Sequence, residues 1–249
     1  MSVLKVQHVI KYFGERLVLD DINFSISAGE CLGIVGLSGG GKSTLAKIIT
    51  RFIPSDGGKI FLCGEDITAL NDNHFYCNMQ MIFQTPEDSF NPRRTLGASI
   101  AEPIKNFIGK DNLRGRVEDL LTEVGLPKSY AERYPREVSG GECQRAAIAR
   151  AISINPKLLI CDEATSALDV TIAAQVVTLI KKLCAERNIA CLFITHDLAT
   201  LKKLTDRVLV LEDGRLKNLS ESKFKEVLFL WRFSNGETKS ADRKLLGRA

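Results

Sequence analysis

One stretch decides the fold of this chain: Gly36-Leu37-Ser38-Gly39-Gly40-Gly41-Lys42-Ser43-Thr44. It fits the phosphate-loop pattern G-x-x-x-x-G-K-S/T at every position, between an apolar run at residues 30–35 and helical spacing at residues 45–49. This is the strand, loop and helix context that the pattern requires. The glycines let backbone N–H groups and the positive end of the helix face phosphate oxygens. We therefore predict a bound nucleotide, with Lys42 at the β- and γ-phosphates and Ser43 on Mg²⁺. The alternative is a simple glycine-rich turn, so further motifs must decide.

Length and composition leave room for such a protein. A chain of 249 residues holds one large domain, or a core with an inserted subdomain. The net charge of +4 is mild, so a basic surface could face nucleic acid, a membrane or a protein partner. No apolar run approaches the ~18 residues of a membrane span, and the N-terminus lacks a signal-peptide core. We expect a cytosolic chain that borrows any membrane part from other chains.

The seven cysteines, at positions 31, 63, 77, 143, 161, 184 and 191, form no C-x-x-C pair. Three of them lie inside apolar, strand-like runs. An odd and scattered set in a chain without an export signal argues against a disulfide framework and against a zinc site. The sequence predicts small core residues at these positions.

The order of the predicted elements indicates an α/β fold. Apolar and polar residues roughly alternate over residues 3–10 and 17–26 around a turn at 14–16, which predicts an antiparallel pair. Further strands are predicted at 59–63, 80–83, 158–161, 190–195 and 207–211, with helices at 172–187 and 198–204. Strands that alternate with helices in this way form a mainly parallel sheet covered by helices.

Residues 95–153 differ from the rest of the chain. Helical spacing runs through 96–108, 113–124 and 143–152, with breaks at Gly109, Gly125 and Pro127. We interpret this region as a helical subdomain inserted into the nucleotide-binding core. The polar tail after Trp231 has little to bury, and we expect it to be mobile.

Two carboxylates, Asp162 and Glu163, follow the buried strand at 158–161. The carboxyl ends of the strands are where an open α/β sheet places its ligand. Asp162 suits Mg²⁺, held through water, and Glu163 suits a water that attacks the γ-phosphate. The alternative is a strand end that simply enters solvent.

A second glycine motif lies at residues 138–145. Ser139 suits a helix N-cap, and Gly140 and Gly141 leave backbone N–H groups accessible, so the motif predicts another anion site. One chain has no obvious need of two such sites. Two chains packed head to tail would place this site against the partner's nucleotide. On that basis, a side chain at Gly141 is expected to harm only the partner's site and to spare an isolated chain.

Together these motifs resemble the nucleotide-binding subunits of ATP-binding cassette (ABC) transporters, over residues 1–230. Residues 36–44 resemble the Walker A loop, 158–163 the Walker B strand, and 138–145 the signature motif. Val138 stands where leucine is usual and Glu142 where glutamine is usual. The glutamate adds a negative charge near the expected γ-phosphate, which puts the strength of nucleotide clamping in question.

The resemblance also assigns roles to single residues. It implies that Gln84 senses Mg²⁺ and the γ-phosphate, that Asp169 lies in the D-loop that crosses to a partner, and that His196 is the switch histidine at the γ-phosphate. From the residue alone, His196 would be a structural histidine after a strand. Phe13 matches the aromatic that stacks on adenine, with Tyr12 as second choice; from the residues alone, packing under the hairpin is an equal reading.

Residues 83–95 resemble the importers of peptides, nickel or nickel chelates. The resemblance implies an ATPase with an α/β P-loop core (residues 1–230, helical subdomain about 95–153, tail 231–249) and the cofactors ATP and Mg²⁺. It further implies a second ATPase subunit, identical or related, two membrane permease subunits and, indirectly, an extracytoplasmic solute-binding protein. The chain would act at the cytoplasmic face of the membrane, with no nucleic acid bound. The alternatives are a soluble ABC ATPase acting on nucleic acid or the ribosome, and a regulator without turnover, which Glu163 and His196 disfavour.

Overall fold

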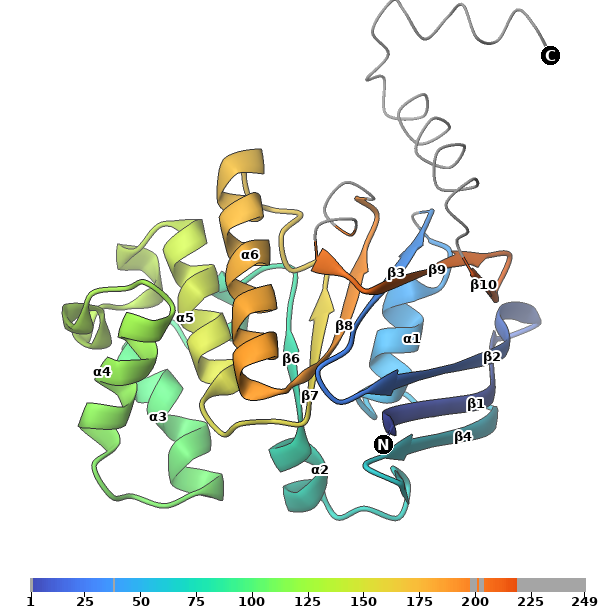
Figure 1. Cartoon of the computed structure of the whole chain (residues 1–249), viewed down its shortest axis with the longest axis horizontal. Coiled ribbons are helices and arrows are strands. Elements are labelled where there is room, and N and C mark those ends of the chain that lie inside the picture. Colours follow the sequence, from blue (N-terminus) through green and yellow to red (C-terminus); the bar gives the residue numbers. More distant parts are fainter. Residues whose placement is uncertain (1, 38, 198–200, 202–203, 219–249) are drawn as a thin grey trace, which may run out of the picture.

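The computed structural model describes residues 2–37, 39–197, 201 and 204–218, which form two sheets and a group of helices (Figure 1). The first sheet has the order β2-β1-β4-β5 and is antiparallel. Its strands are β1 (Ser2–Phe13), β2 (Arg16–Ser27), β4 (Gly57–Leu62) and β5 (Glu65–Asp66). The predicted N-terminal antiparallel pair is therefore confirmed as β1 and β2.

The second sheet has the order β10-β9-β3-β8-β7-β6. Its strands are β3 (Cys31–Gly36), β6 (Met79–Ile82), β7 (Leu158–Asp162), β8 (Ala190–Thr195), β9 (Arg207–Glu212) and β10 (Arg215–Asn218). All neighbouring pairs are parallel except β10 with β9. This arrangement confirms the predicted α/β fold with a mainly parallel sheet and places the carboxyl ends of β3, β6, β7 and β8 at one edge.

The helices are α1 (Lys42–Ile49), α2 (Asp72–Asn78), α3 (Leu96–Phe107), α4 (Leu113–Glu123), α5 (Gly140–Ile152) and α6 (Val170–Arg187). Short 3₁₀ helices occupy Glu87–Ser89, Lys128–Glu132 and Pro135–Glu137. The helices predicted within residues 95–153 are confirmed as α3, α4 and α5. That residues 95–153 form a separate, inserted subdomain stays a prediction. The tail 231–249 and most of the helix predicted at 198–204 lie outside the described residues.

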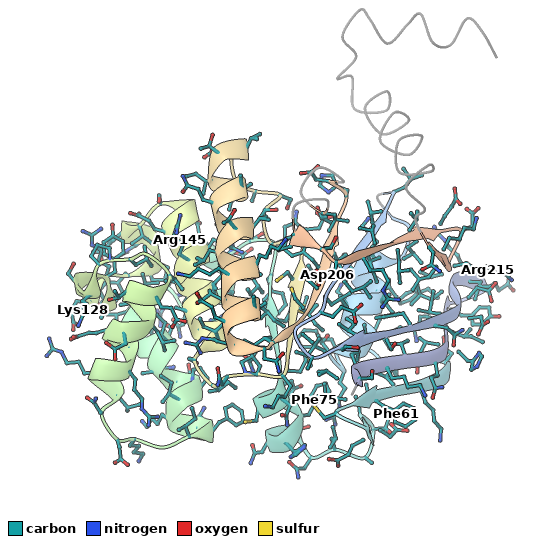
Figure 2. The ribbon with its side chains drawn as sticks, viewed as in Figure 1. Phe61, Phe75, Lys128, Arg145, Asp206 and Arg215 are labelled. Atoms are coloured by element: carbon teal, nitrogen blue, oxygen red, sulfur yellow. The ribbon has the colours of Figure 1, made fainter. Side chains whose placement is uncertain are left out.

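Polar contacts join the two sheets and fix the start of β3. Figure 2 labels two of the residues that make them, Arg215 and Asp206. Arg215 of β10 pairs with Asp20 of β2 at 2.7 Å, beside a backbone bond from Asp20 N to Gly214 O of 2.8 Å. The Asp206 carboxylate accepts a hydrogen bond from Cys31 N at 2.9 Å, before β9 begins. These contacts hold β10 against β2 and the start of β9 against the start of β3.

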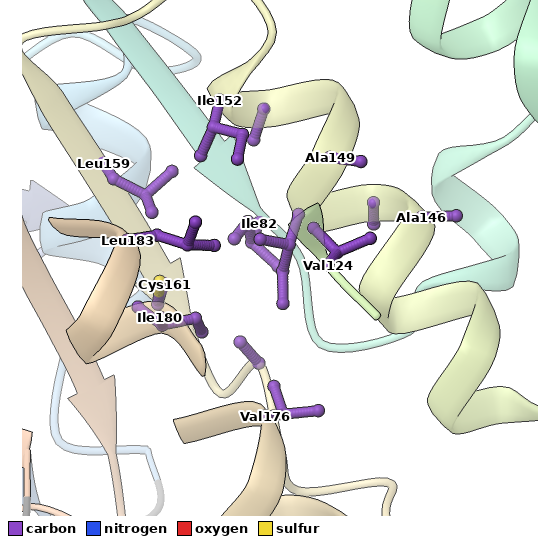
Figure 3. Packing of buried hydrophobic residues seen from close by; sticks show 14 of the residues in the cluster. Ile82, Val124, Ala146, Ala149, Ile152, Leu159, Cys161, Val176, Ile180 and Leu183 are labelled. Carbon is purple, nitrogen blue, oxygen red and sulfur yellow. The ribbon is translucent and has the colours of Figure 1, made fainter. Parts of the chain in front are cut away.

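The central strands divide their side chains between two hydrophobic cores. Leu159, Cys161 and Phe193 belong to a core shared with α3–α6, part of which Figure 3 shows. Their neighbours Leu158, Ile160 and Leu192 belong to a core shared with α1 and the first sheet. Because successive side chains on a strand point to opposite faces, a sheet covered on both faces needs continuous apolar runs. This explains why β7 and β8 have no polar alternation.

Five of the seven cysteines are buried, and all five lie in the core shared with α3–α6: Cys31, Cys143, Cys161, Cys184 and Cys191. The prediction of small core residues is confirmed for these five. It is wrong for Cys63, which is exposed, and only partly right for Cys77, which is half-buried. Hydrogen bonding to neighbouring thiols, first that of Cys161, together with burial raises the pKa of Cys191 well above its usual range, so its thiol stays protonated and packs as a small apolar group.

Candidate functional site

The loop between β3 and α1 has the geometry of an anion cradle. Gly36 ends β3 where a Cβ atom would come within 2.4 Å of the Leu211 carbonyl oxygen, so only glycine lets the loop lie against β9. Gly41 caps α1 with a φ of 97° and no side-chain bond, which leaves the first-turn N–H groups of the helix for a ligand. Leu37 and Gly39 are exposed and Gly40 and Thr44 half-buried, while Ser38 lies outside the described residues.

Lys42 lies inside this cradle. Its side chain is only 4% exposed, and Nζ donates to the carbonyl oxygens of Gly36 and Leu37, each at 2.9 Å. Burial lowers the pKa of Lys42, while the nearby charges of Glu163 and Asp162 oppose that effect. A buried ammonium beside backbone oxygens and two carboxylates is well placed to receive an anionic ligand.

Ser43 and Asp162 meet across the site. Ser43 Oγ lies 3.5 Å from Asp162 Oδ1, although 119 residues separate them in the sequence. Burial raises the pKa of Asp162, and the hydrogen bond from Ser43 partly offsets this. A hydroxyl and a desolvated carboxylate at this separation fit Mg²⁺, which prefers a few hard oxygen ligands from the protein and takes the rest from phosphate and water.

Glu163 and His196 form a second pair at the same edge of the sheet. Glu163 Oε1 lies 3.3 Å from His196 Nδ1, and the glutamate side chain is 20% exposed. Glu163 has a φ of 50°, a backbone conformation that few residues other than glycine adopt. Strained residues of this kind cluster at functional sites. The structure therefore brings together Lys42, Ser43, Asp162, Glu163 and His196, all predicted from the sequence.

Gln84 and the two aromatic residues occupy more exposed positions. Gln84 lies two residues beyond β6, the strand beside β7, and is exposed. Tyr12 and Phe13 end β1 with 45% and 52% of their surface exposed, and Lys11 Nζ lies 5.6 Å from the Phe13 ring centroid. Neither ring is buried beneath the hairpin, which argues against the packing interpretation, and stacking on adenine stays a prediction.

The second glycine motif begins α5 three residues earlier than predicted. Ser139 is the N-cap: its Oγ accepts from Glu142 N, while a Glu142 oxygen accepts from Ser139 N at 2.8 Å and from Ser139 Oγ at 2.9 Å. The Tyr130 hydroxyl donates to the other Glu142 oxygen at 2.6 Å. These bonds, first that from Tyr130, lower the pKa of Glu142. The carboxylate expected to face a γ-phosphate is thus engaged within its own chain. The S-x-x-E spacing of a capping box was the sequence signal for this role.

The start of α5 packs against the segment that leads into α6. A Cβ atom on Gly140 would have only Leu168 Cδ2 nearby, at 3.9 Å, but one on Gly141 would come within 2.6 Å of Ile172 Cγ2. The expectation that a side chain at Gly141 spares the isolated chain is therefore wrong, because β-branched Ile172 on a helix has little freedom to move away. Asp169 accepts from the N–H groups of Thr171 and Ile172 and caps α6. Within the described residues, no hydrogen bond or ion pair joins residues 139–142 to residues 36–44.

A phosphate loop after a buried parallel strand, with Asp162 and Glu163 ending a second strand at the same sheet edge, defines a P-loop nucleotide-binding protein. Residues 19–166, more than half of the chain, match the ABC transporter family, and the chain belongs to that family.

Similar proteins agree with this classification. The chain is 44% identical over 81% of its length to the probable peptide ABC transporter ATP-binding protein y4tS of Sinorhizobium fredii, and 42% identical over 88% to the oligopeptide transport ATP-binding protein AppF of Bacillus subtilis. It spans 59% and 72% of those two proteins, respectively. A solved dimeric structure of the ATP-binding cassette MJ0796, in a post-hydrolysis state bound to ADP and Pi, superposes with a TM-score of 0.75 at 28% identity, covering 87% of this chain and 99% of that one. Among the described residues, no helix has both the length and the apolar character needed to cross a membrane.

Proposed function

We propose that this chain is the ATP-hydrolysing subunit of an ABC importer, which couples ATP turnover to the uptake of a peptide, nickel or metal-chelate solute. The observation that carries the proposal is the pairing of Glu163 with His196 at 3.3 Å, beside the Ser43 and Asp162 pair. The left-handed backbone at Glu163 holds its carboxylate at this edge of the sheet, where it can orient an attacking water. The names of the relatives support a peptide-type solute.

The residues divide the chemistry of ATP hydrolysis among themselves. Lys42 and the N–H groups of the loop hold the phosphates, and Phe13 stacks on the base. Ser43, Asp162 and Gln84 hold Mg²⁺, which supplies positive charge to the phosphate oxygens when bound. Glu163 accepts a hydrogen bond from the attacking water and so orients it. His196 contacts the γ-phosphate. The buried position of Lys42 strengthens its attraction for the phosphates, because water screens it less.

We propose that a second ATPase subunit, identical or related, completes the nucleotide site of this chain. Ser139, Gly140 and Gly141 of one chain face the nucleotide on the phosphate loop of the other, with Glu142 and Asp169 beside them. The solved ATP-binding cassette that superposes on this chain is described as dimeric. In this arrangement Glu142 acts by holding Ser139, and its charge is already compensated by the donors within its own chain.

Gly140→Asp separates the role of the glycine motif from that of the phosphate loop. A Cβ atom at this position meets only Leu168, at ordinary contact distance, and an aspartate suits the first turn of a helix. We expect the isolated chain to bind ATP normally, while like-charge repulsion with the partner's γ-phosphate lowers hydrolysis by on the order of 10²-fold.

Nucleotide titration and steady-state hydrolysis measure these two effects. Ala98→Asp is the matched control, because it adds an aspartate to the exposed first turn of α3. Loss of ATP binding by monomeric Gly140→Asp would mean that the motif serves its own chain, and the head-to-tail dimer would have to be abandoned.

A surface groove next to Gln84 is the proposed contact with one of the two membrane permease subunits. The groove has a volume of about 210 Å³. Phe52 and Phe83 line it with ring centroids 6.3 Å apart, and they are 57% and 38% exposed. Because Phe83 directly precedes Gln84, a loop docked here would follow changes at the γ-phosphate. In this proposal the chain acts at the cytoplasmic face of the cell membrane, and it reaches the solute-binding protein only through the permease.

Affinity purification from detergent-solubilised membranes tests the transport function. We expect the tagged chain to retain two polytopic permease subunits, and Phe52→Ser to lose them while it still binds ATP. Ile108→Ser removes an equally exposed apolar side chain elsewhere and should retain them. Recovery of ribosomes or nucleic acid in place of permeases would support the soluble ABC ATPase instead.

A further inference from the structure

A buried amide joins the start of α5 to the turn that carries Glu163. Gln144 is fully buried, and its Nε2 donates to the carbonyl oxygen of Ala164 at 2.7 Å. Its Oε1 is a buried oxygen that lacks a hydrogen-bond partner among the described residues. Burying an unpaired amide oxygen is unfavourable, so an apolar side chain would suit this helix position better if packing were the only requirement. The hydrogen bond to Ala164 is what glutamine adds.

The turn that receives this bond has an unfavourable backbone conformation. Glu163 has a φ of 50°, and its N–H donates to Ile194 O of β8 at 2.8 Å. Its carbonyl oxygen accepts from Ser166 N at 3.0 Å and from Ser166 Oγ at 2.9 Å. The next carbonyl, that of Ala164, accepts from Gln144. A non-glycine residue stays in this conformation only when its surroundings hold it there from several sides.

Of these three supports, only Gln144 comes from the helix that begins with the glycine motif. One helical turn separates Gln144 from Gly140 and Gly141, which pack against Leu168 and Ile172. The first two turns of α5 and the segment after Glu163 therefore form one packed unit. Any displacement of the helix start is passed to the Ala164 carbonyl through a short hydrogen bond.

We infer that Gln144 is a positioning residue for Glu163, which sets the direction of the glutamate carboxylate and links it to the glycine motif of the same chain. This inference rests on the proposed function. As a consequence, contact between Gly140 and a partner's nucleotide restricts the orientation of the Glu163 carboxylate at the chain's own site. A purely structural role for Gln144 predicts a change in stability with turnover unaffected.

Gln144→Met separates the two roles, because methionine has a similar length and no donor. We expect kcat for ATP to fall about 10-fold, the scale of a small misplacement of a catalytic group. The KM for ATP should stay within about twofold, because the phosphate loop is untouched. Gln175→Met is the matched control. Gln175 accepts a hydrogen bond from Arg145 in the same α5–α6 interface but lies away from the turn after Glu163. The kcat of this variant should stay within about twofold of the wild-type value. A kcat for Gln144→Met within twofold of wild type would overturn the inference.

Ser166→Ala tests the same turn from the exposed side and does not disturb the core. It removes the Ser166 Oγ bond to the Glu163 carbonyl and should lower kcat about threefold at unchanged KM. If Gln144→Met does not fold, an unchanged kcat for Ser166→Ala would overturn the inference in its place. Failure of the proposed function is distinguishable, because wild-type protein would then hydrolyse no ATP, or Glu163→Gln would retain turnover.

Discussion

Replacing Glu163 by glutamine is expected to leave ATP binding intact and to lower ATP turnover by on the order of 10²–10³-fold. Glutamine has the same shape as glutamate but lacks the negative charge that, in the proposed function, orients and polarises the attacking water. The phosphate loop, Lys42 and the Ser43 and Asp162 pair are unchanged. The variant should therefore accumulate as a closed, ATP-bound dimer, because closure needs binding and reopening needs hydrolysis.

Phosphate release and gel filtration with ATP and Mg²⁺ measure these two outcomes. Glu118→Gln is a suitable control, since it neutralises a carboxylate that pairs with Arg114 and Lys128 on the helical side of the molecule. Near-normal turnover by Glu163→Gln would remove the basis for assigning Glu163 as the residue that positions water.

Replacing Lys42 by alanine should act at the binding step. The ammonium is the charged group inside the loop, bonded to Gly36 and Leu37 oxygens at 2.9 Å until a phosphate arrives. Hydrogen bonds to charged groups contribute about 1.5–3 kcal/mol, which predicts a loss of ATP affinity on the order of 10- to 100-fold. Dimer closure should fail as well, in contrast to Glu163→Gln.

Lys47→Ala is the matched control for this experiment, because Lys47 is an exposed lysine in the last turn of the same helix. Equilibrium titration with a fluorescent ATP analogue compares the two variants. Unchanged affinity in Lys42→Ala would show that the loop is not the nucleotide site.

The parts of the fold that sequence predicts well are those in which local pattern and tertiary environment agree. β7 and β8 are buried on both faces and read as continuous apolar runs, and α3 and α6 follow clear helical spacing. The sequence did not predict α2, which is short and is fixed by an Asn71 cap and by burial of Phe75. Nor did it predict β10, whose mostly exposed residues pair with β9. Neither element has a strong periodicity of its own.

In the candidate site, too, some contacts follow from the sequence motifs and others depend on tertiary packing. The motifs predicted that Ser43 would approach Asp162 and that Glu163 would lie near His196, because sheet topology brings the strand ends to one edge. The contacts of Glu142 with Tyr130 and of Gln144 with Ala164 were not predicted. They join side chains across helix packing, where separation in the sequence contains no distance information. Only the tertiary structure shows that Glu142 takes part in the N-terminal cap of α5 and that Gln144 reaches the turn after Glu163.

The side chains of β3, β7 and β8 are divided between two cores, so the central sheet separates two packed layers. A change of side-chain volume at Cys161 alters the packing of α5 and α6. A change one residue earlier, at Ile160, alters the packing of α1 and the first sheet. The core shared with α1 and the first sheet contains no cysteine among its described buried members, whereas the core shared with α3–α6 contains five. The same strands therefore supply the packing surface for the helix after the phosphate loop on one face and for α3–α6 on the other.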